Sequence, residues 1–338
     1  MIEKRFKNEL SLKRYRKLKA NRLSMIGFWA LIVISFFSVT AEFWANSKPV
    51  YMSYEGKSYF PVLKKYHPTD FGRDDMLVMD YRDLEKTTNA KIIWPVVKWD
   101  PFESNKTLDF YPAPPTGSNW FGTDDRGRDI FTRLLYGFRY CFAYAILVWS
   151  ITTLVGVLAG GVMGFFGGKV DLVSQRVVEV LNSVPQFFLL LIIVSIFQPN
   201  LMWLVAISSI FGWIFISYYI RGEFLKNRRM EFVEAARALG ASKRSIILRH
   251  ILPNSLGPVI TFGPFLIAAH ITGLASLDYL GFGLVPPTPS WGELLNQAQQ
   301  HFSTSWWLAI YPSLALFMTL LFLNLVGEGV RDAFDPRK

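Results

Sequence analysis

Apolar residues along this chain gather into long uninterrupted blocks rather than into alternating or helical stripes. The blocks include Met25–Ala41, Tyr140–Phe166, Leu201–Ile220 and Leu308–Val326. A helix that crosses a lipid bilayer needs about 20 mainly apolar residues, and several blocks reach that length. The pattern therefore predicts an all-α polytopic membrane protein.

Six such apolar segments divide the chain into predicted membrane crossings and the polar segments between them. A basic N-terminal region at residues 1–24 precedes the first crossing, and a long polar stretch at residues 46–139 follows it. The other five crossings lie in a core at residues 140–327, which contains a polar loop at residues 221–257, and residues 328–338 form a tail. We predict crossings at residues 25–45, 140–166, 177–197, 201–220, 258–281 and 306–327.

The formal charge of +10 is concentrated beside the apolar blocks. Nine Lys or Arg lie in residues 1–24, eight in 221–249 and three in the last eight residues, whereas residues 47–135 hold thirteen basic and thirteen acidic residues. Because basic residues accumulate on the cytoplasmic side, we expect both termini and the loop in the cytoplasm. Residues 46–139 are then outside. A nucleic-acid site would need the basic residues on one surface, so we expect none.

The first apolar block is expected to remain as a membrane anchor. Its basic flank is longer than that of a secretory signal, and no small-x-small cleavage site follows it. The single cysteine, Cys141, lies in an apolar run and excludes an internal disulfide. We expect it to behave as a small buried hydrophobe.

Residues 47–119 form a candidate extracytoplasmic insertion. They combine Pro, Tyr and Trp with period-2 runs such as Lys91–Trp99. A unit of about 70 residues is only marginally stable alone, so we expect it to pack on the membrane part or on a partner. It contains no cysteine and only one histidine, His67, and we expect no metal site.

Glycines recur every four residues at the end of the second crossing, at Gly156, Gly160, Gly164 and Gly168. This spacing places them on one helix face, where small residues allow a neighbouring helix to approach closely. Close helix packing is the main prediction, and a moving or pore-lining face is the alternative.

Three further residues are candidates for a translocation path or gate. Pro185 removes a backbone hydrogen bond within the third crossing and predicts a kink, which either is tolerated or serves a gate. His270 lies within the fifth crossing, where it is either a packed core residue or a functional group, because ionisable side chains inside membranes are functional candidates. Asp278, like Glu42, falls near a crossing end, where interfacial water could hydrate it.

The loop at residues 221–257 predicts two short helices separated by a turn. Asn227 can cap the first, and apolar side chains at 3–4 spacing then share one face. Gly240 suits the left-handed position that ends a helix, Ser242 can cap the second helix, and Pro253 is expected to end it. The residues predicted on the apolar face are Phe232, Ala235, Ala236 and Leu239. Small alanines suit insertion into a protein groove better than into lipid.

This loop resembles the EAA loop of the permeases of binding-protein-dependent ABC importers. The matching residues are Glu234-Ala235-Ala236, Gly240 and Leu252-Pro253, and His250 stands where the family usually has Ile. The form RHILPN resembles the peptide/nickel branch.

Other segments resemble the same branch. They are WFGTDDRGRDI at 120–130, LGFGLVPPTPSWGELL at 280–295 and GVRDAFDP at 329–336. The segment YEGKSYFPVLKKY at 54–66 resembles the insertion of the YejE-type subunits of Gram-negative peptide importers.

The resemblance implies the six-helix type I ABC importer permease fold in the bacterial inner membrane, moving peptides or peptide-like compounds from periplasm to cytoplasm. It implies a homologous second permease, ABC ATPase subunits that bind ATP and magnesium, and a periplasmic substrate-binding protein. The helix around Glu231–Leu239 would be the coupling helix. Its expected ATPase-contacting residues are Glu231, Glu234, Ala235, Ala236, Leu239 and Gly240.

The chain itself shows no catalytic constellation. It lacks a G-x-x-x-x-G-K-[ST] phosphate loop, so we expect no nucleotide site, no cofactor and no enzymatic activity in this subunit. The alternatives are a secondary transporter working without an ATPase, an ABC permease for a non-peptide substrate such as a nickel complex, and a membrane-anchored enzyme or sensor that uses residues 47–119.

Overall fold

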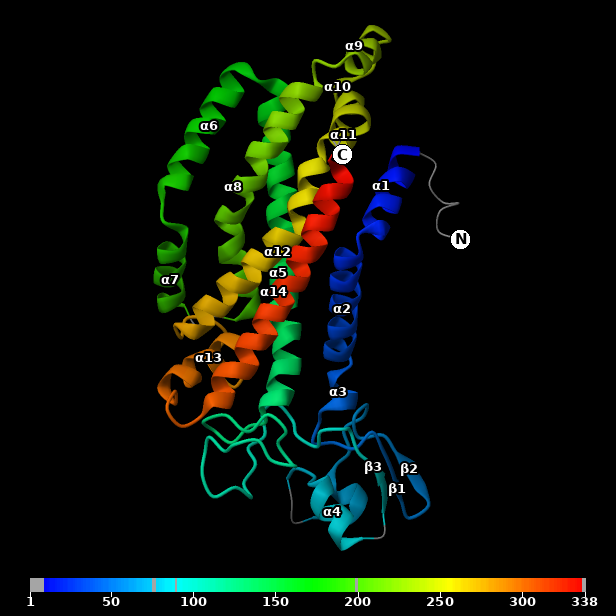
Figure 1. Cartoon of the computed structure of the whole chain (residues 1–338), viewed down its shortest axis with the longest axis vertical. Helices are drawn as coiled ribbons and strands as arrows, with labels where there is room; N and C mark the ends of the chain where they lie inside the picture. The colour runs from blue at the N-terminus through cyan, green and yellow to red at the C-terminus, as the bar shows by residue number, and fades with distance from the viewer. Residues whose placement is uncertain (1–8, 75–76, 89, 198–199, 336–338) are drawn as a thin grey trace.

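The computed structural model of the chain describes residues 9–74, 77–88, 90–197 and 200–335. Long helices run along the molecule, a small unit with strands lies at one end, and short helices lie at the other (Figure 1). The predicted N-terminal region 1–24, the insertion at 47–119 and the tail 328–338 lie partly outside the described residues.

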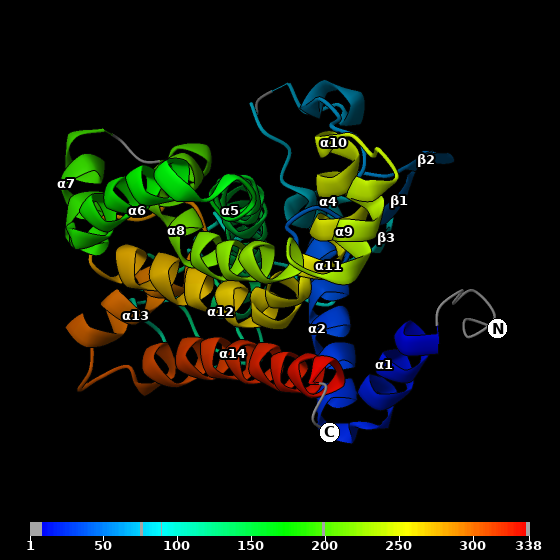
Figure 2. The same cartoon turned by 90° about the horizontal axis from the view of Figure 1, so that it is seen from above.

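Within the described residues, five helices are long and apolar enough to cross a membrane. They are α2 (Arg22–Val39), α5 (Ile130–Phe166), α8 (Leu201–Asn227), α12 (Gly257–Tyr279) and α14 (Trp306–Phe334). Four of them, α5, α8, α12 and α14, stand in successive layers, and α2 packs against α14 (Figure 2). The predicted all-α membrane part is confirmed, and these helices account for every predicted crossing except the third.

The helix of the second crossing begins earlier than predicted, at Ile130 rather than near residue 140. The carboxylate of Asp129 caps it by accepting a backbone N–H of the first turn at 2.8 Å, as an N-cap residue does. Arg133 and Arg139 lie in its first turns and lower the local hydropathy. The apolar pattern alone therefore hides this helix start.

The third crossing is a broken helix pair. The helices α6 (Gly168–Ser183) and α7 (Gln186–Ile196) are bent by 68° at the break between them. Val184 there has an extended backbone, with φ −78° and ψ 128°, because the residue before a proline avoids helical angles. The predicted kink at Pro185 is confirmed, although α6 begins well before the predicted residue 177.

The glycine face of α5 packs against α8. A Cβ on Gly156 would lie 2.8 Å from the carbonyl oxygen of Trp213, one on Gly164 would lie 2.7 Å from that of Arg221, and one on Gly160 would overlap Ser217. Three of the four glycines thus confirm close helix packing. Gly168 instead begins α6 with open space beside it, because α5 ends at Phe166.

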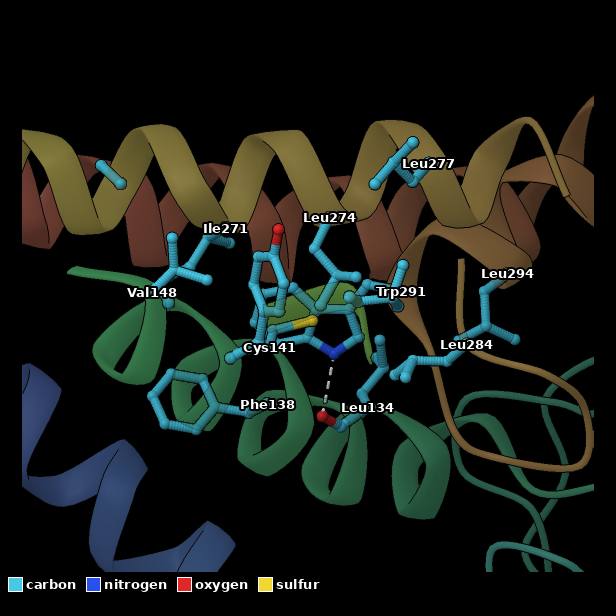
Figure 3. Close-up of a cluster of buried hydrophobic side chains, with 14 of the residues drawn as sticks. Leu134, Phe138, Cys141, Val148, Ile271, Leu274, Leu277, Leu284, Trp291 and Leu294 are labelled. Atoms are coloured by element: carbon cyan, nitrogen blue, oxygen red, sulfur yellow. Dashed lines mark hydrogen bonds between the residues drawn. The ribbon is translucent and has the colours of Figure 1, made fainter. Parts of the chain in front are cut away.

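The main core lies where α5, α8 and α12 meet α13 (Trp291–Gln300) and the start of α14. Trp291 enters this core from α13 and donates its indole N–H to the carbonyl oxygen of Leu134 on α5 at 3.0 Å (Figure 3). Cys141 is buried beside them, with 1% of its surface exposed. Its prediction as a small buried hydrophobe is confirmed.

The insertion at residues 47–119 is a small unit around an antiparallel sheet of order β2-β1-β3. Its core contains Met52, Phe71, Tyr81 and Leu84. Of the period-2 run Lys91–Trp99, only the first three residues form a strand, because Pro95 cannot donate to a strand ladder. The elements are α3 (Ala41–Trp44), β1 (Tyr51–Tyr54), β2 (Lys57–Tyr59), a 3-10 helix (Pro68–Phe71), α4 (Tyr81–Thr87) and β3 (Lys91–Ile93).

The opposite end carries the short helices of the predicted polar loop (Figure 1). They are α9 (Glu231–Ala238), α10 (Lys243–Ser245), a π-helical segment (Ile246–Ile251) and α11 (Leu252–Ser255). The N-terminal helix α1 (Glu9–Ala20) packs against α14, where the Arg14 guanidinium lies 4.4 Å from the centre of the Phe334 ring.

Candidate functional site

The first helix of the loop, α9, begins later than predicted. α8 continues through Asn227, whose side-chain amide donates to the hydroxyl of Ser255 at 2.9 Å. The predicted capping role of Asn227 is therefore wrong. Met230 occupies the N-cap of α9 without a side-chain hydrogen bond. The buried Phe224 near the end of α8 explains the longer helix, since it continues the buried apolar face of Ile216 and Ile220 toward the end of α8.

The two faces of α9 differ in what covers them. Val233 and Ala236 are buried, with 0% and 9% exposure, and Val233 belongs to the same apolar cluster as Ile246 and Ile251. The prediction that Ala236 shares a face with Phe232 and its neighbours is wrong. Ala236 follows Val233 by three residues and turns inward with it.

The outward face of α9 remains apolar and exposed. Phe232 is 42% exposed and Leu239 is 88% exposed, with the exposed Ala235 between them. Glu231 and Glu234 flank this face and are also exposed. We call Glu231, Phe232, Glu234, Ala235 and Leu239 the α9 outer face. A large apolar side chain as exposed as Leu239 marks an interaction surface when it belongs to such a patch.

A glycine turn joins α9 to the second half of the loop. Gly240 has φ +79°, a left-handed conformation, and the N–H of Ala241 bonds the carbonyl of Ala236 at 3.0 Å, so the predicted helix end is confirmed. The hydroxyl of Ser242 accepts the N–H of Ser245 at 3.3 Å, which confirms the second cap. Pro253 lies in the first turn of α11, where proline is tolerated, so the prediction that it ends the helix is wrong.

The loop is fastened to several membrane helices. The Arg228 guanidinium donates to the carbonyl oxygens of Gly164 and Phe165 at 3.1 Å each, at the end of α5. These carbonyls have no partner within the helix and favour a cation. The bond from Asn227 to Ser255 joins the end of α8 to α11, so the loop is held against both α5 and α8.

A second feature is a cavity of about 280 Å³ between α5, α7, α8 and α12. His270 and Gln186 line it, as do Tyr144 and Ser208, whose hydroxyls are 2.6 Å apart. Pro185 immediately precedes Gln186, so the break in the third crossing lies beside the cavity. Two of the three predicted path or gate residues, Pro185 and His270, thus lie at the same cavity.

The third candidate, Asp278, lies elsewhere. It is buried at the end of α12 and accepts the N–H of Leu284 at 2.6 Å and the hydroxyl of Ser290. It holds the turn between α12 and α13 and is not hydrated at an interface. Glu42, by contrast, is half-buried and paired with Arg139 at 2.7 Å.

Comparison with known proteins decides the family. Residues 156–338, more than half of the chain, match the family described as the binding-protein-dependent transport system inner membrane component. The chain belongs to this family of ABC permeases. The resemblance inferred from the loop and its flanking motifs is confirmed.

Three relatives illustrate the likeness of this permease to known subunits. It is 40% identical over 333 residues to the inner membrane ABC transporter permease protein YejE of Escherichia coli strain K12, with 96% of each chain covered. It is 37% identical to the peptidoglycan transport system permease protein YejE of Agrobacterium fabrum, over 96% of this chain and 93% of that one. It is 36% identical to the oligopeptide transport system permease protein OppC of Haemophilus influenzae, over 67% and 73% of the two chains.

The permease also contains a buried ionic cluster that its sequence did not reveal. Arg128 contacts Asp124 at 2.6 Å and Glu293 at 3.0 Å, and Arg133 contacts Asp124 at 3.4 Å and also pairs with Glu293. The motif at 120–130 is thereby joined to α13. Burial disfavours the charged form of Arg128, but its two carboxylate partners outweigh burial and keep its pKa above the usual value.

Other residues of the permease were also missed from sequence. Val233, Arg228 and Gln186 have no motif of their own, and their roles arise from contacts between helices. Within the described ranges, no three His, Cys, Asp or Glu side chains are grouped as metal ligands, and the absence of a metal site stays a prediction.

Proposed function

We propose that this permease subunit imports peptides from the periplasm into the cytoplasm, driven by ATP that a separate ATPase subunit hydrolyses. The observation that carries this proposal is the α9 outer face. It is an exposed apolar helix surface flanked by two carboxylates, and the loop beneath it is tied to the membrane helices.

The charge distribution supports the orientation of this surface. Nine Lys or Arg lie in residues 1–24 and eight lie in 221–249, and such clusters mark the cytoplasmic side. α9 then lies in the cytoplasm of a bacterium with an inner membrane, as do both termini. The unit containing β1, β2 and β3 lies in the periplasm, at the opposite end of the molecule (Figure 1).

The coupling mechanism follows from these contacts. Phe232, Ala235 and Leu239 insert into a groove of the ATPase, and Glu231 and Glu234 supply polar anchors at its rim. ATP and magnesium are bound by the ATPase. When its subunits close, α9 moves with the groove, and Arg228 passes that movement to the end of α5. The bundle then changes from inward-open to outward-open.

Three further partners complete the importer. A homologous permease forms the other half of the path, a periplasmic binding protein delivers the substrate, and lipid surrounds both subunits. The peptide substrate is supported by relatives of this permease that belong to oligopeptide and dipeptide transport systems.

The proposal is tested by reconstituting this permease with its second permease, ATPase and binding protein in proteoliposomes. We expect uptake of radiolabelled tri-alanine only when ATP and all components are present. Liposomes without the ATPase, supplied with a proton or sodium gradient, are the control. Uptake under a gradient alone, or ATP-driven uptake of a nickel complex but of no peptide, would contradict the proposal.

A further inference from the structure

The cavity beside the break in the third crossing differs from an ordinary packing defect. Four polar side chains from four helices line it: Tyr144 of α5, Gln186 of α7, Ser208 of α8 and His270 of α12. The rest of its wall is largely apolar, and among the described residues that line it there is no Asp, Glu, Lys or Arg.

His270 and Gln186 differ from the other two polar groups in their bonding. In the part of the chain that the structure describes, neither the imidazole of His270 nor the side-chain amide of Gln186 makes a hydrogen bond, whereas Tyr144 and Ser208 bond each other at 2.6 Å. His270 is partly buried, where a polar group without a hydrogen bond is costly, and the amide of Gln186 is exposed at the mouth of the cavity. Intramembrane polar residues of this kind therefore point to a ligand or a path.

A second cavity in the membrane part provides a contrast. It measures about 490 Å³ and lies between α5, α6 and α8. Its polar lining consists of Ser174 and the indole of Trp213, and that indole already donates to the carbonyl of Ile210 at 2.8 Å. Within the described residues, only the small hydroxyl of Ser174 lacks a bond there, so this cavity does not bring unbonded polar groups of facing helices together.

We propose that the cavity of about 280 Å³ is a peptide-binding station on the translocation path, in which His270 and Gln186 hydrogen-bond the main chain of the passing peptide. This inference rests on the proposed function. The second permease subunit closes the exposed side, where Gln186 and Phe187 reach the surface of this chain.

The chemistry of the lining fits a peptide main chain. Each peptide unit carries one N–H donor and one C=O acceptor without net charge. A carboxamide and a neutral imidazole both donate and accept, so they match that pair. Because every residue has the same main chain, such contacts hold peptides of any sequence, while the apolar wall formed by Phe187, Leu190 and Leu277 receives varied side chains.

The size of the cavity agrees with this use. Ligand pockets generally start at about 300 Å³ and combine apolar walls with a few placed polar groups. The cavity is close to that lower limit, so it takes a short extended segment and not a folded chain.

The first test locates the peptide directly in the complete importer in proteoliposomes. A tripeptide with a diazirine-bearing central residue is irradiated during ATP-driven transport, and the adducts are mapped by mass spectrometry. We expect adducts on α7 and α12 residues of the cavity, removed by excess tri-alanine, and none on Val173 or Val177 of the apolar cavity. Competable adducts elsewhere on the permease, with none on α7 or α12, would overturn the inference.

The second test separates hydrogen bonding from packing. His270→Leu removes the donor and acceptor, and we expect initial uptake to fall about three- to tenfold, the effect of losing one neutral hydrogen bond. His270→Gln keeps both functions, and we expect it to restore most of the uptake. The matched control is Ser209→Ala on α8, whose hydroxyl bonds its own helix at the Val205 carbonyl, and we expect it to leave uptake unchanged.

The outcomes distinguish this inference from the proposed function. Absence of peptide uptake by the wild-type importer contradicts the proposed function. If the wild-type importer takes up peptide normally, two results would contradict the peptide-binding station but leave the proposed function intact. One is normal uptake by His270→Leu, and the other is a loss of uptake in His270→Gln as large as that in His270→Leu. If a variant fails to accumulate in the membrane, the photolabelling of the wild-type importer still shows whether peptide binds in this cavity.

Discussion

Replacing Gly240 by valine will lower ATP-driven peptide uptake at least about fivefold, while the permease stays in the membrane. Gly240 has φ +79°, and a Cβ added there would meet no atom within 4 Å. Valine therefore adds backbone strain of about 1–3 kcal/mol, and about 1.4 kcal/mol corresponds to a tenfold change. The strain shifts the turn that orients α9. Uptake per permease molecule in right-side-out vesicles or reconstituted proteoliposomes measures the effect.

Asparagine at the same position is the matched control. It adopts the left-handed conformation more readily than other non-glycine residues, so Gly240→Asn should retain most of the uptake. Equal uptake by the valine variant and the wild type, at equal amounts in the membrane, would show that this turn does not set the coupling geometry.

The second large effect concerns the buried ionic cluster at the outer end of α5. Arg133 is fully buried, with 0% side-chain exposure, and faces both Asp124 and Glu293. Removing one partner of a buried ion pair costs about 3–5 kcal/mol, because it leaves an uncompensated charge. We therefore expect Arg133→Met to lower the thermal denaturation midpoint strongly and to reduce the folded yield in detergent.

Arg126 offers a control within the same motif. Its side chain is 56% exposed and lies 4.0 Å from Asp125, and exposed pairs of this kind contribute about 0–1 kcal/mol. Arg126→Met should denature close to the wild-type midpoint. If the Arg133 and Arg126 variants denature at the same temperature, the ionic cluster does not stabilise the junction of α5 and α13.

The membrane helices could be predicted because the bilayer imposes one simple requirement on length and polarity. Prediction from hydropathy missed the start of α5. Arg133 and Arg139 lower the hydropathy there, yet both are compensated by residues far away in sequence, Glu293 and Glu42. A window of neighbouring residues contains no information about such partners.

The loop between α8 and α12 likewise contains some residues whose roles could be predicted from sequence and others whose roles could not. Gly240 and Ser242 act through local backbone geometry, and both were predicted correctly. The burial of Ala236 depends on which side of α9 meets Ile246 and Ile251, and its assignment from spacing alone was wrong. A repeat of three and four residues defines two neighbouring stripes on so short a helix, and only tertiary contact selects between them.

The candidate path was only partly accessible from sequence. His270 and Pro185 stood out because each is unusual inside a crossing. Gln186, Ser208 and Tyr144 are ordinary residues at their own positions, and they become a set only when α5, α7, α8 and α12 pack together. Asp278 stood out equally, but the turn beyond α12 uses its carboxylate.

Cross-linking of the α9 outer face tests the central claim most directly. The native Cys141 is 1% exposed, so a cysteine introduced by Ala235→Cys is the reactive thiol of choice, and Ser303→Cys, exposed at the opposite end, is its control. With a short bifunctional thiol–amine reagent on the transport-competent complex, the account predicts a covalent product of Ala235→Cys with the ATPase and none from Ser303→Cys. An Ala235→Cys complex that transports peptide but yields no product with the ATPase would contradict it.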